Sequence, residues 1–226
     1  MSSAVPRVTP QEAWGTFIAG NERFIANRSE HPNQDVERRT KLASNQAPNV
    51  ALFGCSDSRL AAEIIFDCGL GDLFIARNMG HVVAESITAS MEYAVTALGS
   101  ALIVVLAHDS CGAVAAAIDQ SGRVPTAVTS SIENTLAPIR PAVQQLWLRD
   151  HSVTPYADAA EIDANHVGRI HLAATVTALL RGSRAISDAV DRGELGIVGC
   201  QYRLAEGRAV PYTAVGPLDI ELSPIN

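Results

Sequence analysis

The stretch "ALIVVLAHDSCGAVAAAI", residues 101–118, decides the fold class of this chain. It opens with a near-continuous run of aliphatic and β-branched residues, which is typical of a strand buried on both faces of a parallel sheet. A short polar loop follows, and the alanine-rich end favours a helix. Because a buried strand that leads through a loop into a helix is one half of a βαβ unit, the stretch predicts an α/β fold.

The segments before and after it repeat this alternation of apolar runs and helical patterns. We therefore expect a mostly parallel central β-sheet flanked by helices. The expected strands, some with the loops that follow them, are "NVALFGCSDS" (49–58), "DLFIARNMG" (72–80), "LGIVGCQYRL" (195–204) and a short return strand "RAVPYTAV" (208–215). The expected helices are residues 61–67, 87–98, 132–148 and 165–191, the last with a possible break at Gly182.

The N-terminal part of the chain has a different pattern. Residues 10–27, "PQEAWGTFIAGNERFIAN", place their large apolar side chains at helical intervals, so this segment predicts an amphipathic arm that packs on something outside itself. A chain of 226 residues is long enough to bury one large core. We therefore predict a single domain over residues 1–226, with a helical arm (1–45) and an α/β core (46–226).

Composition and charge exclude several classes of partner. The chain has 17 basic and 24 acidic residues, a net charge of −7, and no basic cluster, so nucleic acid is not an expected partner. No segment has the length of uncharged apolar sequence that a membrane span needs, and we expect a soluble, cytoplasmic protein. In such a reducing compartment the four cysteines stay free, which favours metal or catalytic roles. We assign Cys68 and Cys200 to packing.

Reactive side chains gather where two of the expected strands end. Cys55, Asp57 and Arg59 follow the first strand, while His108 and Cys111 follow the strand in residues 101–110. The carboxyl ends of adjacent strands in an open α/β sheet converge on one crevice. Two thiolates and one imidazole are a typical zinc ligand set, and a helix N-terminus at Cys111 favours the thiolate. The sequence thus predicts a zinc site with a fourth position available.

Asp57 has two possible positions beside this site. A bidentate pair with Arg59 would leave it near a water on the zinc, whereas an Asp57 that swings onto the zinc would be the fourth ligand and close the site. A surface ion pair of little consequence is the plainer alternative. Two other kinds of site are weaker: a structural zinc would fill all four positions, and a Cys55–His108 nucleophile pair would leave Cys111 without a role.

At these residues the chain resembles the β-class carbonic anhydrases, in their bacterial, plant-like subtype. The motifs are "CSDSR" (55–59) and "HDSCG" (108–112), and the resemblance extends through "FIARN" and "EYAV" to "GIVGCQY". It implies one Zn²⁺ per chain, held by Cys55, His108 and Cys111, with Asp57 and Arg59 as a catalytic dyad. The implied reaction is reversible hydration of CO₂ to bicarbonate and a proton by zinc-bound hydroxide. Hydrolysis of carbon disulfide or carbonyl sulfide on the same fold is the alternative.

The resemblance also implies a substrate pocket and an assembly. Gln46 would bind the substrate by a hydrogen bond, Gly112 would offer its backbone N–H, and Phe74, Met79 and Tyr93 would line the pocket. Members of this family are dimers or higher multiples, with pockets built across the subunit interface. A homodimer or homotetramer would also supply a packing partner for the N-terminal arm.

The chain departs from the family pattern at two positions. Leu52 stands where another subtype has a tryptophan of a regulatory bicarbonate site, so we expect no strong bicarbonate regulation even though Arg77 and Tyr202 match the rest of that site. The usual "RN-x-A-N" is "RNMGH" here, which brings His81 near the pocket wall. Of the two roles open to His81, a solvated loop histidine is favoured over a proton relay.

Overall fold

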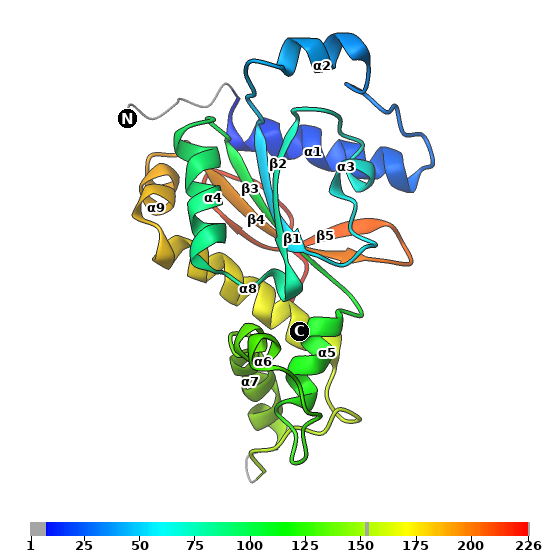
Figure 1. Ribbon diagram of the computed structural model, residues 1–226, viewed down its shortest axis with the longest axis vertical. Helices are drawn as coiled ribbons and strands as arrows, with labels where there is room; N and C mark the ends of the chain where they lie inside the picture. The colour runs from blue at the N-terminus through cyan, green and yellow to red at the C-terminus, as the bar shows by residue number, and fades with distance from the viewer. Residues whose placement is uncertain (1–7, 152–153, 226) are drawn as a thin grey trace.

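The computed structural model describes residues 8–151 and 154–225, which form a five-stranded sheet with helices on both faces (Figure 1). The strands are β1 (Val50–Cys55), β2 (Leu73–Asn78), β3 (Leu102–His108), β4 (Gly196–Arg203) and β5 (Arg208–Val215). The helices are α1 (Pro10–Ile25), α2 (Val36–Leu42), α3 (Ala62–Ile65), α4 (Glu85–Thr96), α5 (Gly112–Asp119), α6 (Ser130–Leu136), α7 (Arg140–Asp150), α8 (Ala164–Gly182) and α9 (Arg184–Asp191). A short 3₁₀ helix, η1 (Met79–His81), follows β2.

The sheet has the order β2-β1-β3-β4-β5, and only β5 runs antiparallel to its neighbour. Every residue of β1 and β3 is buried, because helices cover both faces of the two central strands. One apolar cluster joins the sheet to α1, α3, α5 and α7, and a second joins its other face to α4, α8 and α9. The predicted mostly parallel α/β fold is therefore confirmed.

Helix α1 packs on its own chain. A capping box formed by Thr9 and Glu12 begins the helix, and Trp14 and Phe17 are buried on its inner face. The Phe17 ring stacks on Phe66 with centroids 3.8 Å apart, and α1 also contacts β3 and β5. The predicted amphipathic segment thus forms a helix, and its packing partner is the sheet of the same subunit.

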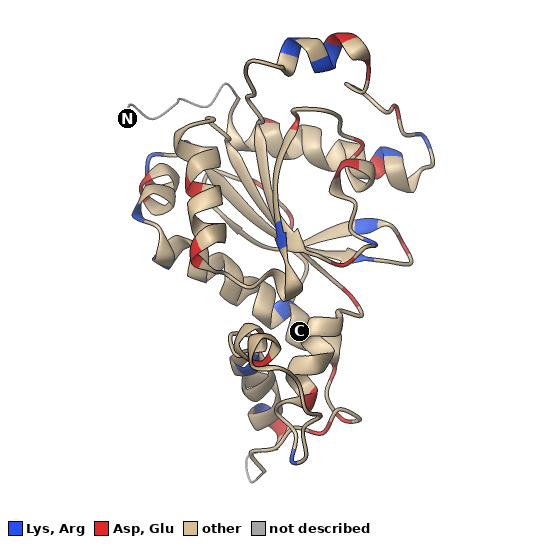
Figure 2. Cartoon of the chain, in the orientation of Figure 1, with Lys and Arg blue, Asp and Glu red and all other residues tan. Residues whose placement is uncertain are grey.

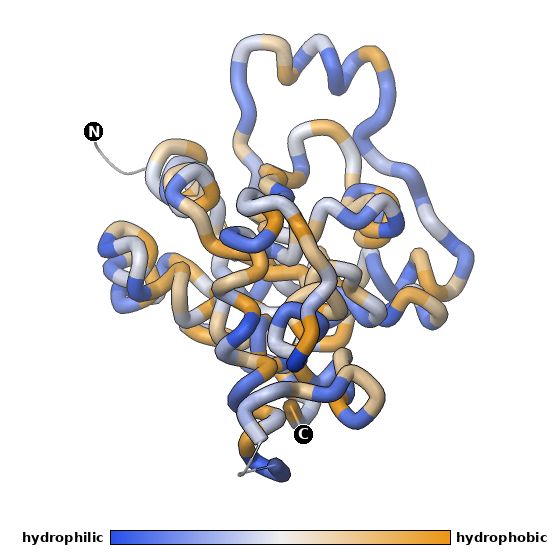
Figure 3. Tube along the Cα trace, turned by 60° about the horizontal axis from the view of Figure 1, so that its bottom comes forward, coloured by the Kyte–Doolittle hydropathy of each residue, from blue (hydrophilic) through white to orange (hydrophobic). Residues whose placement is uncertain are grey.

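Helix α2 was not expected from the sequence and buries none of its residues. Asp35 caps its first turn, and four of its seven residues are charged. Figure 2 shows charges of both signs along this helix. Figure 3 shows that the segment that carries α2 is mostly hydrophilic. Local capping and charge, rather than burial, account for α2, which is why apolar periodicity did not reveal it.

Two of the expected helical regions are each divided in two. The region 132–148 is split into α6 and α7 near Pro138, and α8 ends at Gly182, where a break was predicted. Ser183 then caps α9 by accepting a hydrogen bond from the Ile186 N–H at 3.1 Å. None of the helices in the described part of the chain is long and apolar enough to cross a membrane.

Candidate active site

Strands β1 and β3 end side by side and bring the three predicted ligands together. Cys55 is the last residue of β1, His108 is the last residue of β3, and Cys111 is the N-cap of α5. One ligand atom from each of the three lies within 4.8 Å of the other two, and all three residues are buried. The close approach of the two strand ends therefore assembles donors that are about fifty residues apart in sequence.

The imidazole of His108 is oriented for metal binding. Its Nδ1 lies 2.8 Å from the Asp109 carbonyl oxygen, which only accepts, so Nδ1 carries the proton and Nε2 keeps its lone pair. Nε2 is buried and bonds to no nitrogen or oxygen atom of the described residues; it faces the Cys55 sulfur. A buried nitrogen without a partner is costly unless a ligand satisfies it. With two thiols beside it, this nitrogen fits zinc.

Backbone N–H groups surround both sulfur atoms. Cys55 accepts hydrogen bonds from the N–H groups of Gly80 and Asp57, and a hydrogen bond from the Cys111 thiol is the largest contribution that lowers its pKa. The Cys111 sulfur accepts hydrogen bonds from N–H groups in the first turn of α5. Its hydrogen bond to Cys55 and its burial raise the pKa of the Cys111 thiol. The N–H donors stabilise the thiolate forms that zinc requires.

Arg59 holds the carboxylate of Asp57 by two side-chain contacts. Arg59 Nε donates to Oδ1 at 2.8 Å and Nη2 donates to Oδ2 at 2.7 Å, and the Arg59 backbone N–H also donates to Oδ1 at 2.9 Å. This pairing holds the pKa of Asp57 well below its usual range. Asp57 Oδ2 stays 3.8 Å from His108 Nε2, and Asp57 is not part of the ligand cluster found among the described residues. The structure thus adopts the open position of Asp57.

Arg77 supports the loop that carries Cys55 and Asp57, a role that the sequence analysis missed. Its Nε donates to the Cys55 carbonyl oxygen at 2.7 Å, and its Nη2 donates to the Asp57 carbonyl oxygen. In the sequence, only its place near the end of the next expected strand pointed to this role; in the structure it pairs in register with Gly54. Arg77 is thus committed to two backbone carbonyls of its own subunit.

Two of the five predicted substrate-binding residues lie beside the metal ligands. Met79 follows Asn78, which pairs in register with Cys55, and its side chain is partly exposed. Gly112 is the first residue of α5, next to Cys111, and a Cβ built on it would meet nothing within 4 Å. Met79 and Gly112 are therefore neighbours of the metal ligands in the chain or in the sheet, and the space at the Gly112 Cβ position is open.

The other three predicted pocket residues lie at the opposite end of β2. Phe74 pairs in register with Ala51, four residues before the last residue of β1, which places it about 13 Å along the strand from that end. Its ring centroid is 6.1 Å from that of Tyr93, and Tyr93 and Gln46 line one surface depression together with Leu98. A single chain therefore does not bring Gln46, Phe74 and Tyr93 to the metal ligands.

The prediction that His81 is a solvated loop residue is wrong. Its side chain is only 1% exposed, and its ring centroid lies 4.6 Å from that of His171 on α8. His81 is buried because the left-handed turn of η1, with φ of +71° at Gly80 and +43° at His81, directs the chain against α8. Burial is the main reason that the pKa of His81 falls well below its usual range, so the ring is neutral at physiological pH.

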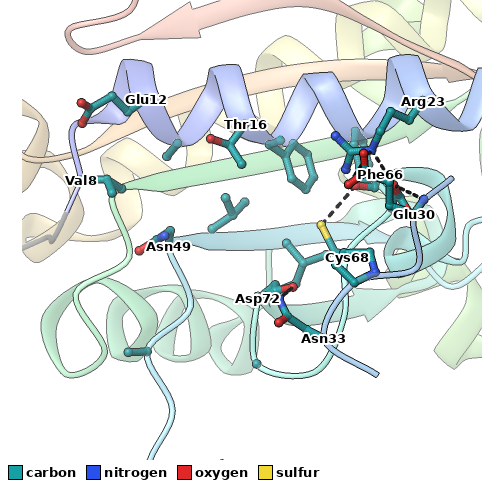
Figure 4. Close-up of a pocket in the computed structure, with 18 of the residues that line it drawn as sticks. Val8, Glu12, Thr16, Arg23, Glu30, Asn33, Asn49, Phe66, Cys68 and Asp72 are labelled. Atoms are coloured by element: carbon teal, nitrogen blue, oxygen red, sulfur yellow. Dashed lines mark hydrogen bonds and ion pairs between the residues drawn. The ribbon is translucent and has the colours of Figure 1, made fainter. Parts of the chain in front are cut away.

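A cavity of about 470 Å³ lies elsewhere, between α1 and the beginning of β1 (Figure 4). Four of its charged side chains form two ion pairs: Arg23 Nε lies 2.6 Å from Asp67 Oδ2, and Arg38 Nη2 lies 3.0 Å from Asp72 Oδ1. None of the predicted site residues lines it. This cavity is therefore separate from the metal centre.

Comparisons with known proteins agree with the site. Residues 50–209 match the family model described as carbonic anhydrase. Carbonic anhydrase 2 of Mycobacterium tuberculosis is 42% identical over 220 residues, which cover 96% of this chain and 100% of that protein. A carbonic anhydrase of Mycolicibacterium smegmatis is 41% identical over 206 residues, which cover 90% of this chain and 94% of that protein.

Solved structures share the fold. The β-carbonic anhydrase CafA of Aspergillus fumigatus has a TM-score of 0.68 at 26% identity and covers 90% of this chain and 92% of its own. A tetrameric β-carbonic anhydrase of Sordaria macrospora also has a TM-score of 0.68, at 21% identity, and the match covers 91% of this chain and 100% of that one. This likeness concerns the fold alone.

The fold and the three donors define a zinc enzyme built on a mostly parallel α/β sheet. The family match and the relatives go further, and the chain belongs to the carbonic anhydrase family, in its β class. Its cofactor is zinc, and its reaction is the reversible hydration of carbon dioxide to bicarbonate and a proton.

Proposed function

We propose that this reaction takes place at one Zn²⁺ per chain, in a crevice that Asp57 and Arg59 keep open and that a second copy of the chain completes. The observation that carries this proposal is the pairing of Asp57 with Arg59, because a carboxylate held by three hydrogen bonds is not free to act as the fourth ligand. A structural zinc site would have all four positions filled.

Each residue of the crevice has a separate task in this proposal. Cys55, His108 and Cys111 hold zinc, which supplies the Lewis acidity that makes water a nucleophile near neutral pH. Asp57 is ionised and accepts a hydrogen bond from the attacking water, which orients it. The N–H of Gly112, a first-turn donor of α5 with no hydrogen-bond acceptor among the described residues, binds a substrate oxygen.

Turnover is expected to rise with pH between about pH 7 and about pH 9. Two thiolates and a neutral imidazole cancel the charge of zinc, so water at this site keeps its proton to a higher pH than it would beside three neutral histidines. Asp57 does not contribute to the rise, because its lowered pKa leaves it ionised throughout this range. Stopped-flow measurement of CO₂ hydration checks this expectation, and a flat profile would contradict it.

We also propose that the whole chain, residues 1–226, acts as one domain and assembles into a homodimer or homotetramer in the cytoplasm. All four cysteines are free, which supports a reducing compartment. Strand β2 is one of the two edges of the sheet, and Tyr93 beside it is half exposed. A second copy covering this edge would bring Gln46, Phe74 and Tyr93 to its neighbour's zinc site, which the single chain does not achieve.

Hybrid oligomers test whether the pocket is shared. We expect Cys55→Ser to be inactive and Gln46→Leu to lose about 10-fold in activity, because the substrate loses one hydrogen-bond donor. The two variants, coexpressed with different affinity tags and isolated as a hybrid, are expected to regain about half of the wild-type activity, since one of two sites would have both zinc and Gln46. A hybrid no more active than the average of its parents would show that Gln46 does not act across an interface.

A further inference from the structure

The η1 turn lies in contact with the three elements that carry the zinc ligands. It contacts β1 and β3, which end at Cys55 and His108, and α5, which begins after Cys111. The Gly80 N–H donates to the Cys55 sulfur. Gly80 has φ of +71°, and a Cβ at this position would lie 2.9 Å from the Ala113 Cβ. The conformation of this turn therefore sets the direction of an N–H group that touches a metal ligand.

Helix α8 holds the same turn from its other side. His171 Nε2 donates to the Gly80 carbonyl oxygen at 2.9 Å, and Thr175, one helical turn later, donates to the His81 carbonyl oxygen at 3.5 Å. Both side chains are buried, at 3% and 2% exposure. Their neighbours on α8 are core residues, so two polar groups stand where packing alone would place apolar ones. Figure 1 shows α8 meeting α5 at this end of the sheet.

We propose that His171 is a positioning residue for the zinc ligand Cys55, acting through the backbone of Gly80. Its hydrogen bond fixes the peptide after Gly80, and the N–H that reaches the sulfur belongs to the peptide before it. The two peptides are linked by the φ and ψ angles of one left-handed glycine, so releasing the first allows the second to turn away from Cys55. This inference rests on zinc binding at Cys55 and not on the proposed course of catalysis.

A matched pair of variants isolates the donated hydrogen bond. His171→Gln keeps an N–H donor on an unbranched side chain, while His171→Met has similar length and volume but no donor. We expect His171→Met to release zinc to a chelator about 10-fold faster than wild type, and His171→Gln to remain within about 3-fold of it. In the Co²⁺-substituted proteins, only the Met variant should shift the thiolate-to-metal charge-transfer band to lower energy, because Cys55 loses a hydrogen bond.

Two further variants keep the test decisive. Thr175→Val removes the second contact and is expected to give a smaller change in the same direction, and it decides the question if His171→Met does not fold. His166→Met, on the same helix but beside α7 residues and with no hydrogen bond to η1 among the described residues, is expected to keep the wild-type release rate and spectrum. Equal zinc release from the Gln and Met variants, or an unchanged Co²⁺ spectrum in His171→Met and Thr175→Val, would overturn the proposal.

Discussion

Replacing Cys111 by serine is expected to remove zinc from the protein and to lower CO₂ hydration by about 10³-fold. A serine hydroxyl does not ionise near neutral pH, so the first turn of α5 would offer zinc a neutral oxygen in place of a thiolate. Cys55 and His108 would remain, but two ligands do not hold zinc in a site of this kind. Zinc content per chain and stopped-flow hydration measure the two losses.

Cys200→Ser is the matched control for this variant. This substitution replaces the same sulfur by oxygen, but at a residue that is fully buried on β4 and far from the zinc ligands in sequence. Burial raises the pKa of the Cys200 thiol. We expect Cys200→Ser to keep one zinc per chain and to lose about 1–3 kcal/mol of stability, because a hydroxyl is buried in the core. A Cys111→Ser protein with full zinc content and activity within about 10-fold of wild type would refute the ligand assignment.

Replacing Arg59 by alanine is expected to lower kcat/KM by about 100-fold while zinc content stays at one per chain. The two side-chain contacts that hold Asp57 would be lost, and the carboxylate would be free to take the fourth coordination position. The variant therefore separates an open site from a closed one without disturbing the three ligands. Zinc content per chain and steady-state CO₂ hydration kinetics, measured on the same sample, check both parts of this prediction.

Two controls define the reason for that loss. Arg192→Ala removes a similarly close ion pair, 2.8 Å from Arg192 Nη2 to Glu194 Oε2, in a helix end far from the ligands in sequence and fold, and activity should not change. Adding Asp57→Ala to Arg59→Ala removes the carboxylate that would close the site and should recover part of the activity. If Arg59→Ala alone stays within about 3-fold of wild type, the dyad does not keep the site open.

The alternation of apolar runs with helical segments was sufficient to predict the class of fold. Strands β1 and β3 are buried along their whole length, so their sequences are short, continuous apolar runs bounded by polar loops, the pattern of fully buried strands. The zinc donors were also predictable, because Cys55 and His108 stand at the ends of such runs, where parallel strands converge. Helix α2 was not predictable from apolar periodicity, since it buries nothing.

The sequence by itself thus determined the parallel α/β sheet and the identity of the zinc donors, because both follow from patterns within short segments. Only the tertiary structure decided that Asp57 rests on Arg59, that His81 is buried against His171, and that Phe74 lies far from the metal ligands of its own chain. The burial of His81 and the position of Phe74 depend on contacts between segments that are distant in sequence and on the backbone angles of η1. The Asp57–Arg59 pair is local, but hydrogen bonds from Arg77 on β2 and to the Ser110 carbonyl oxygen hold its loop in place. Burial and hydrogen-bond partners of that kind exist only once the chain has folded.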